Sequence, residues 1–221
     1  MLWFRKISLV VLFVLLAGLA ASAQTALQKA QQLQLQARAN AVAGNWDQAI
    51  AHYEQAVQLA PRSADSHIEL GDVLMRVARY AEAIASYREA LRISPHDLNA
   101  AMGLAQAYRN VHNYDEAKRI LEQSHAEHPG SPKPFAVLGD LDIELQTYES
   151  AIAHLRAALK LAPADQESRI RLAVAYETTG DADDALAQIA KVLARDPKSA
   201  LAYYTRAKIY SDRNQFYEHV D

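Results

Sequence analysis

Five of the seven prolines in this 221-residue chain recur every 34 residues, at Pro61, Pro95, Pro129, Pro163 and Pro197. A fixed period of this length indicates a repeat architecture, in which each unit buries its apolar face against its neighbours. Because the chain contains no cysteine, this packing must hold the fold together without disulfides. After a short lead-in over 24–29, the chain aligned to itself gives five complete blocks and a partial sixth repeat or capping helix: residues 30–63, 64–97, 98–131, 132–165, 166–199 and 200–221.

Each block has the composition of two helices. Helix-forming residues dominate from Thr25 onward without strand-like alternation, and a short break such as Ala43-Gly44-Asn45 divides the block. The periodic proline closes the second helix, and two residues later a Ser or Asp offers an oxygen to the free N–H groups that open the next helix. The expected caps are Ser63, Asp97, Ser131, Asp165 and Ser199, with Pro132 at the first helical position of its block.

Small and large residues recur at fixed positions of these helices. The twentieth position is alanine in all five blocks, whereas the twenty-fourth is bulky, as in Tyr53, Tyr87 and Leu155. The eighth position, in the first helix, is always glycine or alanine. Small residues opposite large ones let two helices approach to about 8–10 Å and interlock. The sequence therefore predicts an all-α chain of stacked antiparallel helix hairpins.

The recurring residues resemble the signature of the tetratricopeptide repeat (TPR) family. Block two carries Leu70-Gly71, Tyr80, Ala83, Tyr87 and Pro95, and block four carries the similar Leu138-Gly139, Tyr148, Ala151 and Pro163. Departures from the pattern cluster in the terminal blocks, as is usual at the ends of a repeat stack. The resemblance implies a right-handed α-solenoid (TPR superhelix) of about five and a half repeats. It also implies a concave groove that binds extended or helical segments of partner proteins.

The first 23 residues have the pattern of a secretory signal peptide. Arg5 and Lys6 precede an apolar run over 7–21, which ends on the small residues Ala21-Ser22-Ala23. As a helix, the run would reach roughly 22 Å, short of the ~30 Å hydrocarbon core of a bilayer. We therefore expect cleavage after Ala23 and a periplasmic or secreted protein. The alternative is an uncleaved segment that anchors the chain in the inner membrane, facing the periplasm.

The resemblance places the partner-binding surface on the first helix of each block. At 100° per residue, positions 2, 5, 9 and 12 centre about 130° away from the stripe that faces the core. Position 5 is largely apolar, whereas the like charges of Asp140 and Glu144 would select a partner with basic residues. The predicted groove residues are Ile68, Asp72, Met75, Met102, Gln106, Arg109, Asp140, Ile143, Glu144, Ile170, Val174 and Tyr204.

Two ordinary interpretations of these residues stay open. Ile68, Met102 and Ile170 would serve the fold alone if they only pack against neighbouring repeats, as single apolar residues commonly do. The acidic side chains would have no role in binding another protein if they simply face water, as charged runs usually do.

Several function classes are excluded or unsupported. The formal charge of −3, without a run of Lys and Arg, argues against nucleic-acid binding, which requires a cationic surface. We find no phosphate-binding glycine loop, nucleophile elbow or His-Glu-x-x-His motif, and so predict no catalytic residue and no cofactor. Glu122, His125 and His128 share a helix face, but three such residues alone do not define a metal site. We predict no metal.

The sequence thus predicts a non-catalytic protein-interaction scaffold of the periplasm or cell envelope, within an envelope assembly or secretion system. One alternative is the targeting region of a longer chain, with a catalytic domain beyond residue 221. The other is a self-assembling structural protein. Self-association would use the aromatic edge of the last block, which contains Tyr203, Tyr204, Tyr210, Phe216 and Tyr217.

Overall fold

The computed structural model describes residue 22 and residues 24–218, with side chains up to residue 212. Apart from Ser22, the predicted signal peptide lies outside the described residues. Within the described part of the chain, no helix has both the length and the apolar character needed to cross a membrane.

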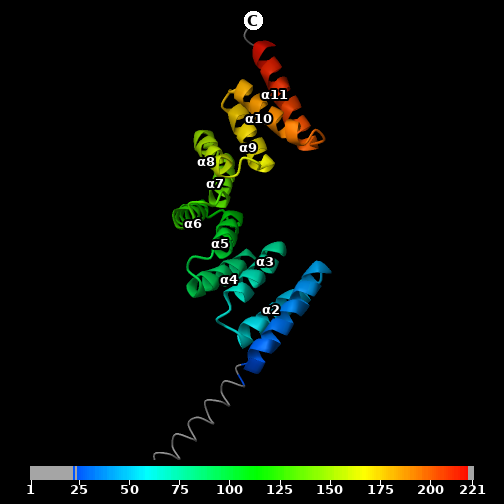
Figure 1. Cartoon of the computed structure of the whole chain (residues 1–221), viewed down its shortest axis with the longest axis vertical. Helices are drawn as coiled ribbons and strands as arrows, with labels where there is room; N and C mark the ends of the chain where they lie inside the picture. The colour runs from blue at the N-terminus through cyan, green and yellow to red at the C-terminus, as the bar shows by residue number, and fades with distance from the viewer. Residues whose placement is uncertain (1–21, 23, 219–221) are drawn as a thin grey trace, which may run out of the picture. The chain divides into compact units, whose positions relative to one another are not determined.

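The described residues form helices joined by short turns, with no strand among them (Figure 1). Residues 24–42 make the first helix. The prediction of an all-α solenoid of stacked helix hairpins is confirmed. The helices that follow are α2 (Trp46–Leu59), α3 (Ala64–Arg76), α4 (Tyr80–Ile93), α5 (Leu98–Asn110), α6 (Tyr114–Glu127), α7 (Lys133–Glu144), α8 (Tyr148–Leu161), α9 (Gln166–Thr178), α10 (Ala182–Arg195) and α11 (Ala200–Glu218).

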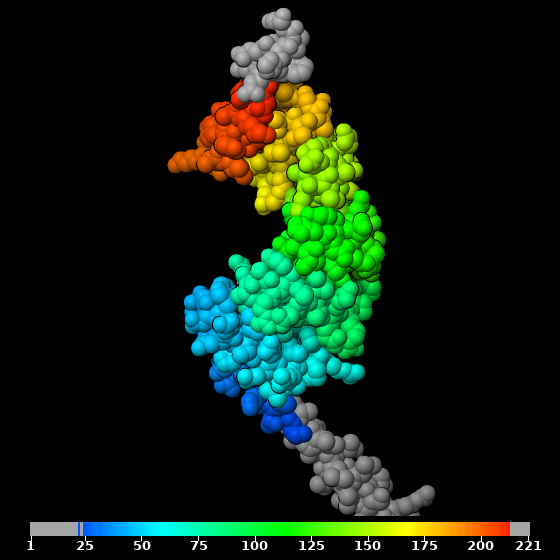
Figure 2. Space-filling view, turned by 180° about the vertical axis from the view of Figure 1, so that it is seen from behind, coloured from blue at the N-terminus to red at the C-terminus, as the bar shows by residue number. Residues whose placement is uncertain are grey.

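The chain divides into two compact units, Met1–Val111 and His112–Asp221, with the boundary between α5 and α6. In the first unit, α3 packs on α2, α4 and α5. In the second unit, α7 packs on α6, α8 and α9, and α9 packs on α8, α10 and α11. Within each unit the helices therefore stack in the order of the chain, as the colour sequence of Figure 2 shows.

The periodic residues lie where the helices begin and end. Each of the five prolines follows the last residue of a second helix by two positions, for example Pro61 after Leu59. The caps predicted at Ser63, Asp97, Asp165 and Ser199 each accept a hydrogen bond from a backbone N–H of the helix that follows. Block four differs by one residue, because Pro132 occupies the cap position and α7 begins at Lys133. There Ser131 accepts from the N–H of Lys133 at 3.4 Å.

The core consists of the small and large residues that the repeat pattern pairs. The alanines at position 20 and the bulky residues at position 24 are all buried in both units. The close fit is clearest at Gly139, where an added Cβ would lie 2.5 Å from Cγ of Leu155. Overpacking of this kind costs typically 1–3 kcal/mol, so the small residue is a requirement of the packing.

The turn inside each repeat contains one residue in the left-handed region. These residues are spaced by 34, and they are Gly44, Ala78, His112, Gln146 and Gly180, with φ between 57° and 90°. A side chain in this region costs roughly 1–2 kcal/mol, and glycine avoids that cost. The middle three turns therefore carry backbone strain that the first and last turns do not.

We expect Gln146→Gly to raise the free energy of unfolding of the second unit by about 0.5–1 kcal/mol. It relieves the left-handed strain, and the greater freedom of glycine in the unfolded chain offsets only part of the gain. Urea unfolding followed by circular dichroism measures the change.

Gly180→Ala is the matched control, because an added Cβ there would meet nothing within 4 Å and only the backbone changes. It should destabilise the same unit by about 1 kcal/mol. Loss of stability in Gln146→Gly would contradict the assignment of strain to this turn.

Candidate functional site

The residues predicted to bind a partner lie on the first helix of each pair, and we call the surface that they form the first-helix face. In the first unit it belongs to α3 and α5, which pack against each other. In the second unit it belongs to α7, α9 and α11, of which α9 contacts the other two. Each unit therefore places the predicted positions of successive repeats on neighbouring helices.

The first-helix face of the first unit is partly exposed and combines apolar with polar side chains. Ile68 and Met75 on α3 and Met102, Gln106 and Arg109 on α5 are all half-buried. These five predicted residues thus lie, partly exposed, on two helices that pack against each other.

Asp72 is held in this surface by a core tyrosine. The ring of Tyr87, on α4, packs so closely against Gly71 that an added Cβ there would lie 2.7 Å from the ring, and Gly103 of α5 is an equally close neighbour. The Tyr87 hydroxyl donates to Oδ1 of Asp72 at 2.6 Å. Asp72 is an exposed residue, but partial desolvation of its carboxyl group beside Tyr87, with the charge of Glu69 nearby, raises its pKa, and the hydrogen bond opposes the shift. Burial also raises the pKa of Tyr87.

Ion pairs join the first helices of successive repeats. In the first unit Arg38 pairs with Glu69, and Nε of Arg38 lies 3.1 Å from Oε1 of Glu69. Burial, with Glu69 close by, raises the pKa of Tyr53 beneath this pair to about 12. The same surface also contains a hydrogen bond from Nε2 of Gln34 to Oγ of Ser66, at 2.6 Å.

The second unit repeats this arrangement with the charges reversed. Nε of Arg171 lies 2.7 Å from Oδ1 of Asp140, and the same guanidinium lies 2.7 Å from Glu167. Glu177 pairs with Lys208 at 3.1 Å, and burial, with Asp212 close by, raises the pKa of Glu177 against the effect of the lysine. Like Arg38–Glu69, the pairs Asp140–Arg171 and Glu177–Lys208 span 31 residues. Of the residues in these three pairs, only Asp140 is among the predicted groove residues.

The remaining predicted residues of the second unit differ in exposure. Glu144 is exposed and accepts a hydrogen bond from the Tyr114 hydroxyl at 3.0 Å. Ile143 and Val174 are half-buried. Ile170 is 8% exposed and belongs to a core cluster, which agrees with the interpretation that it packs between repeats.

The predicted aromatic edge is described only in part. On α11, Tyr204 is 70% exposed, and Tyr203 and Tyr210 are also exposed. The side chains of Phe216 and Tyr217 lie outside the described residues.

A second polar cluster lies inside the fourth repeat. Asp142 is buried, and its Oδ2 lies 2.6 Å from Nδ1 of His154, while Oδ1 accepts from the Thr147 hydroxyl at 3.0 Å. The ring of Phe135 packs between His154 and His125, with the His125 centroid 4.0 Å away. With both oxygens of the buried Asp142 paired, these hydrogen bonds fix the α7–α8 turn. Across the described residues, no group of three or more His, Asp or Glu side chains is placed to hold a metal ion.

The free energy of unfolding of Asp72→Asn should rise relative to that of the wild type as the pH rises. In the folded state the pKa of Asp72 lies above its unfolded value of 3.8, so ionisation of this group opposes folding. Wild-type stability should therefore fall relative to Asp72→Asn as the pH rises from below 4, through the folded-state pKa, to 7. Urea unfolding of both proteins across this range measures the difference.

Asp72→Ala is the control for the hydrogen bond. The asparagine oxygen can still accept from Tyr87, whereas alanine leaves the hydroxyl unpaired and should cost about 1–3 kcal/mol at every pH. A stability difference between wild type and Asp72→Asn that does not vary with pH would contradict the raised pKa.

Solved structures similar to the chain are repeat proteins of the same architecture. A tetratricopeptide repeat protein from Parabacteroides merdae ATCC 43184 has a TM-score of 0.73 and 19% identity, and the match covers 85% of this chain and 74% of that one. TTC0263, a thermophilic TPR protein in Thermus thermophilus, has a TM-score of 0.64 and 23% identity, over 83% and 98% of the two chains. YrrB, a TPR protein with an unusual peptide-binding site, has a TM-score of 0.58 and 26% identity, over 73% and 84%.

Family comparison agrees with the fold. No curated protein matches the chain. Family models described as tetratricopeptide repeat match residues 35–97, 74–141 and 142–209. Such a fold supports a protein-interaction scaffold with protein or peptide partners. Since one of these models alone covers more than half of the sequence, the chain belongs to the tetratricopeptide repeat family.

Proposed function

We propose that this protein is a non-catalytic scaffold of the periplasm or cell envelope, acting within an envelope assembly or secretion system. It binds an extended or helical segment of a partner protein on the first-helix face. The observation that carries this proposal is that three predicted apolar side chains on the packed helices α3 and α5, those of Ile68, Met75 and Met102, stay partly exposed. Apolar side chains gathered on one surface give a partner segment area to bury.

The charges of the second unit favour a partner with basic residues. On α7, α9 and α11, five carboxylates accompany the cations Arg171 and Lys208 on the first-helix face, and these helices also carry Lys133 and Arg206. Arg171 and Lys208 are each already shared between two carboxylates. The surplus negative charge would attract a Lys- or Arg-bearing segment and speed its association. The carboxylates are Asp140, Glu144, Glu167, Glu177 and Asp212.

A triple substitution tests binding on this face. Ile68→Glu, Met102→Glu and Tyr204→Glu together should abolish recovery of the partner from an envelope extract, because each places a charge where an apolar contact forms. We substitute Tyr204 rather than Ile170, because Ile170 is buried and a carboxylate in its place would disrupt the core. Pull-down with the tagged protein, followed by mass spectrometry, measures recovery.

The matched control carries three glutamates at exposed apolar positions outside the first-helix face. Val42, Leu145 and Leu161 are 91%, 41% and 41% exposed, so Val42→Glu, Leu145→Glu and Leu161→Glu add the same charge with little effect on the fold. Circular dichroism establishes that both triple variants are folded. Equal partner recovery by the two variants would remove this face as the binding surface.

Export has its own test. Expressed in Gram-negative cells, the full chain should be released by osmotic shock as a mature protein that begins at Gln24, as N-terminal sequencing would show. A variant with Ala21→Arg and Ala23→Arg lacks the small residues of the cleavage site and should accumulate uncleaved. An uncleaved wild-type chain in the cytosol would contradict the proposed location.

A further inference from the structure

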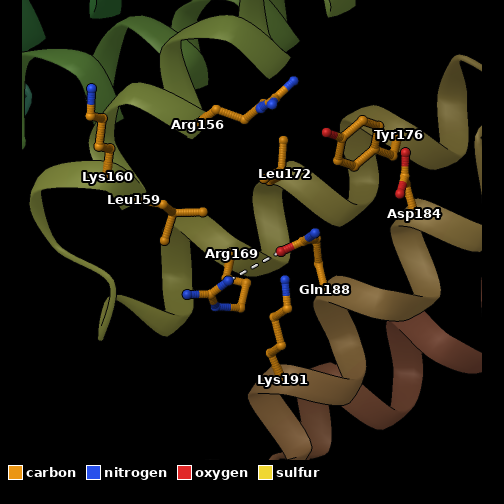
Figure 3. Close-up of a pocket in the computed structure, with 9 residues that line it drawn as sticks. All are labelled: Arg156, Leu159, Lys160, Arg169, Leu172, Tyr176, Asp184, Gln188 and Lys191. Atoms are coloured by element: carbon orange, nitrogen blue, oxygen red, sulfur yellow. Dashed lines mark hydrogen bonds between the residues drawn. The ribbon is translucent and has the colours of Figure 1, made fainter.

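The second unit contains a pocket away from the first-helix face. It lies between α8, α9 and α10 and has a volume of about 460 Å³, within the range of ligand-binding pockets (Figure 3). The buried Leu159 and Leu172 supply its apolar part, and the ring of Tyr176 lies beside Leu172. No residue predicted for the first-helix face lines it.

Cationic side chains dominate the lining of this pocket. They are Arg156 and Lys160 of α8, Arg169 of α9 and Lys191 of α10, against the single carboxylate of Asp184. The local surplus is notable in a chain with a formal charge of −3. Four like charges around one pocket repel each other, and an anionic ligand would remove that repulsion.

Three of the four cations are available to a ligand. Arg156, Lys160 and Lys191 are exposed, and within the described residues none of them has a carboxylate at ion-pair distance. Arg169 is half-buried and held in place, because its guanidinium donates to the carbonyl of Pro163 at 2.7 Å and to Oε1 of Gln188 at 3.1 Å. In Figure 3, Arg169 and Lys191 lie together, with Arg156 on the other side of Leu172.

The arrangement suits carboxylates along a peptide better than a single phosphate. No glycine lines the pocket, and the lining residue in the first turn of α10 is the carboxylate of Asp184, so the pocket lacks the usual cradle of a phosphate. Its cations are spread over three helices, and Lys160 points away from Arg169 (Figure 3). The leucines and Tyr176 between them can pack against the methylene groups of Asp and Glu side chains.

We propose that this pocket binds an acidic segment of a partner protein, with Arg156, Arg169 and Lys191 pairing with its Asp or Glu carboxylates. This site is separate from the first-helix face and selects the opposite charge. Guanidinium groups suit the task because they bind carboxylates with two parallel hydrogen bonds.

Fluorescence anisotropy with fluorescein-labelled hexaglutamate tests the proposal on the whole protein at low salt. Arg156→Gln with Lys191→Gln should weaken binding at least tenfold, because it removes two exposed cations of the pocket. Lys133→Gln with Lys198→Gln is the matched control, because it removes the same charge from exposed residues of this unit that do not line the pocket. The control should change the dissociation constant less than twofold.

The outcomes separate the pocket from general electrostatic attraction. The site is supported if the pocket variant binds hexaglutamate more weakly and the control does not, while circular dichroism shows that both variants are folded. Equal weakening in both variants, or no binding of hexaglutamate by wild type, overturns it. Unlabelled pyrophosphate is the competing probe, and binding of pyrophosphate without hexaglutamate would show a small-anion site instead. Since neither Arg156 nor Lys191 belongs to the proposed first-helix face, failure of binding on that face would leave this result unchanged.

Discussion

Contact between a bulky second-helix residue and a glycine or alanine of a first helix sets the spacing of the helices on which the rest of each unit depends. In the first unit the ring of Tyr87 packs against Gly71 and Gly103, which belong to two successive repeats. In the second unit Leu155 packs against Gly139. An added Cβ at any of these glycines would collide with the large side chain. Because Tyr87 also donates to Asp72, the same packing orients a polar group at the surface.

Most of the fold followed from the sequence, because its determinants are local and periodic. The proline and cap positions depend on residues within one turn of a helix end, and four of the five predicted caps lie as expected. The exception at Ser131 has a local cause too, since Pro132 takes the cap position. The left-handed turns were harder to predict. Glycine indicates this conformation at Gly44 and Gly180, whereas Ala78, His112 and Gln146 adopt it because the packed helices on either side impose the turn.

The candidate site was less predictable, because side-chain pairing between repeats depends on how neighbouring helices are rotated and offset. The 34-residue period gives equivalent positions, but the ion pairs of the first-helix face join residues 31 apart, as in Asp140–Arg171. A helical-wheel argument placed Ile170 on this face, whereas contacts with the following helices bury it. No run of positive charge in the sequence predicts the cationic pocket, because Arg156, Arg169 and Lys191 are well separated along the chain and line one pocket only in the folded unit.

Helix α9 shows how one repeat can serve two surfaces of opposite charge. Arg169 and Arg171 are two residues apart, which turns their side chains about 200° around the helix axis. Arg171 therefore pairs with Asp140 and Glu167 on the first-helix face, whereas Arg169 is held by Pro163 and Gln188 in the pocket beside α10. The small, buried Ala173 and Ala175 of the same helix keep its neighbours close on both sides. The two proposed binding surfaces depend on this separation around α9, because the charges that attract one partner must not neutralise those that attract the other.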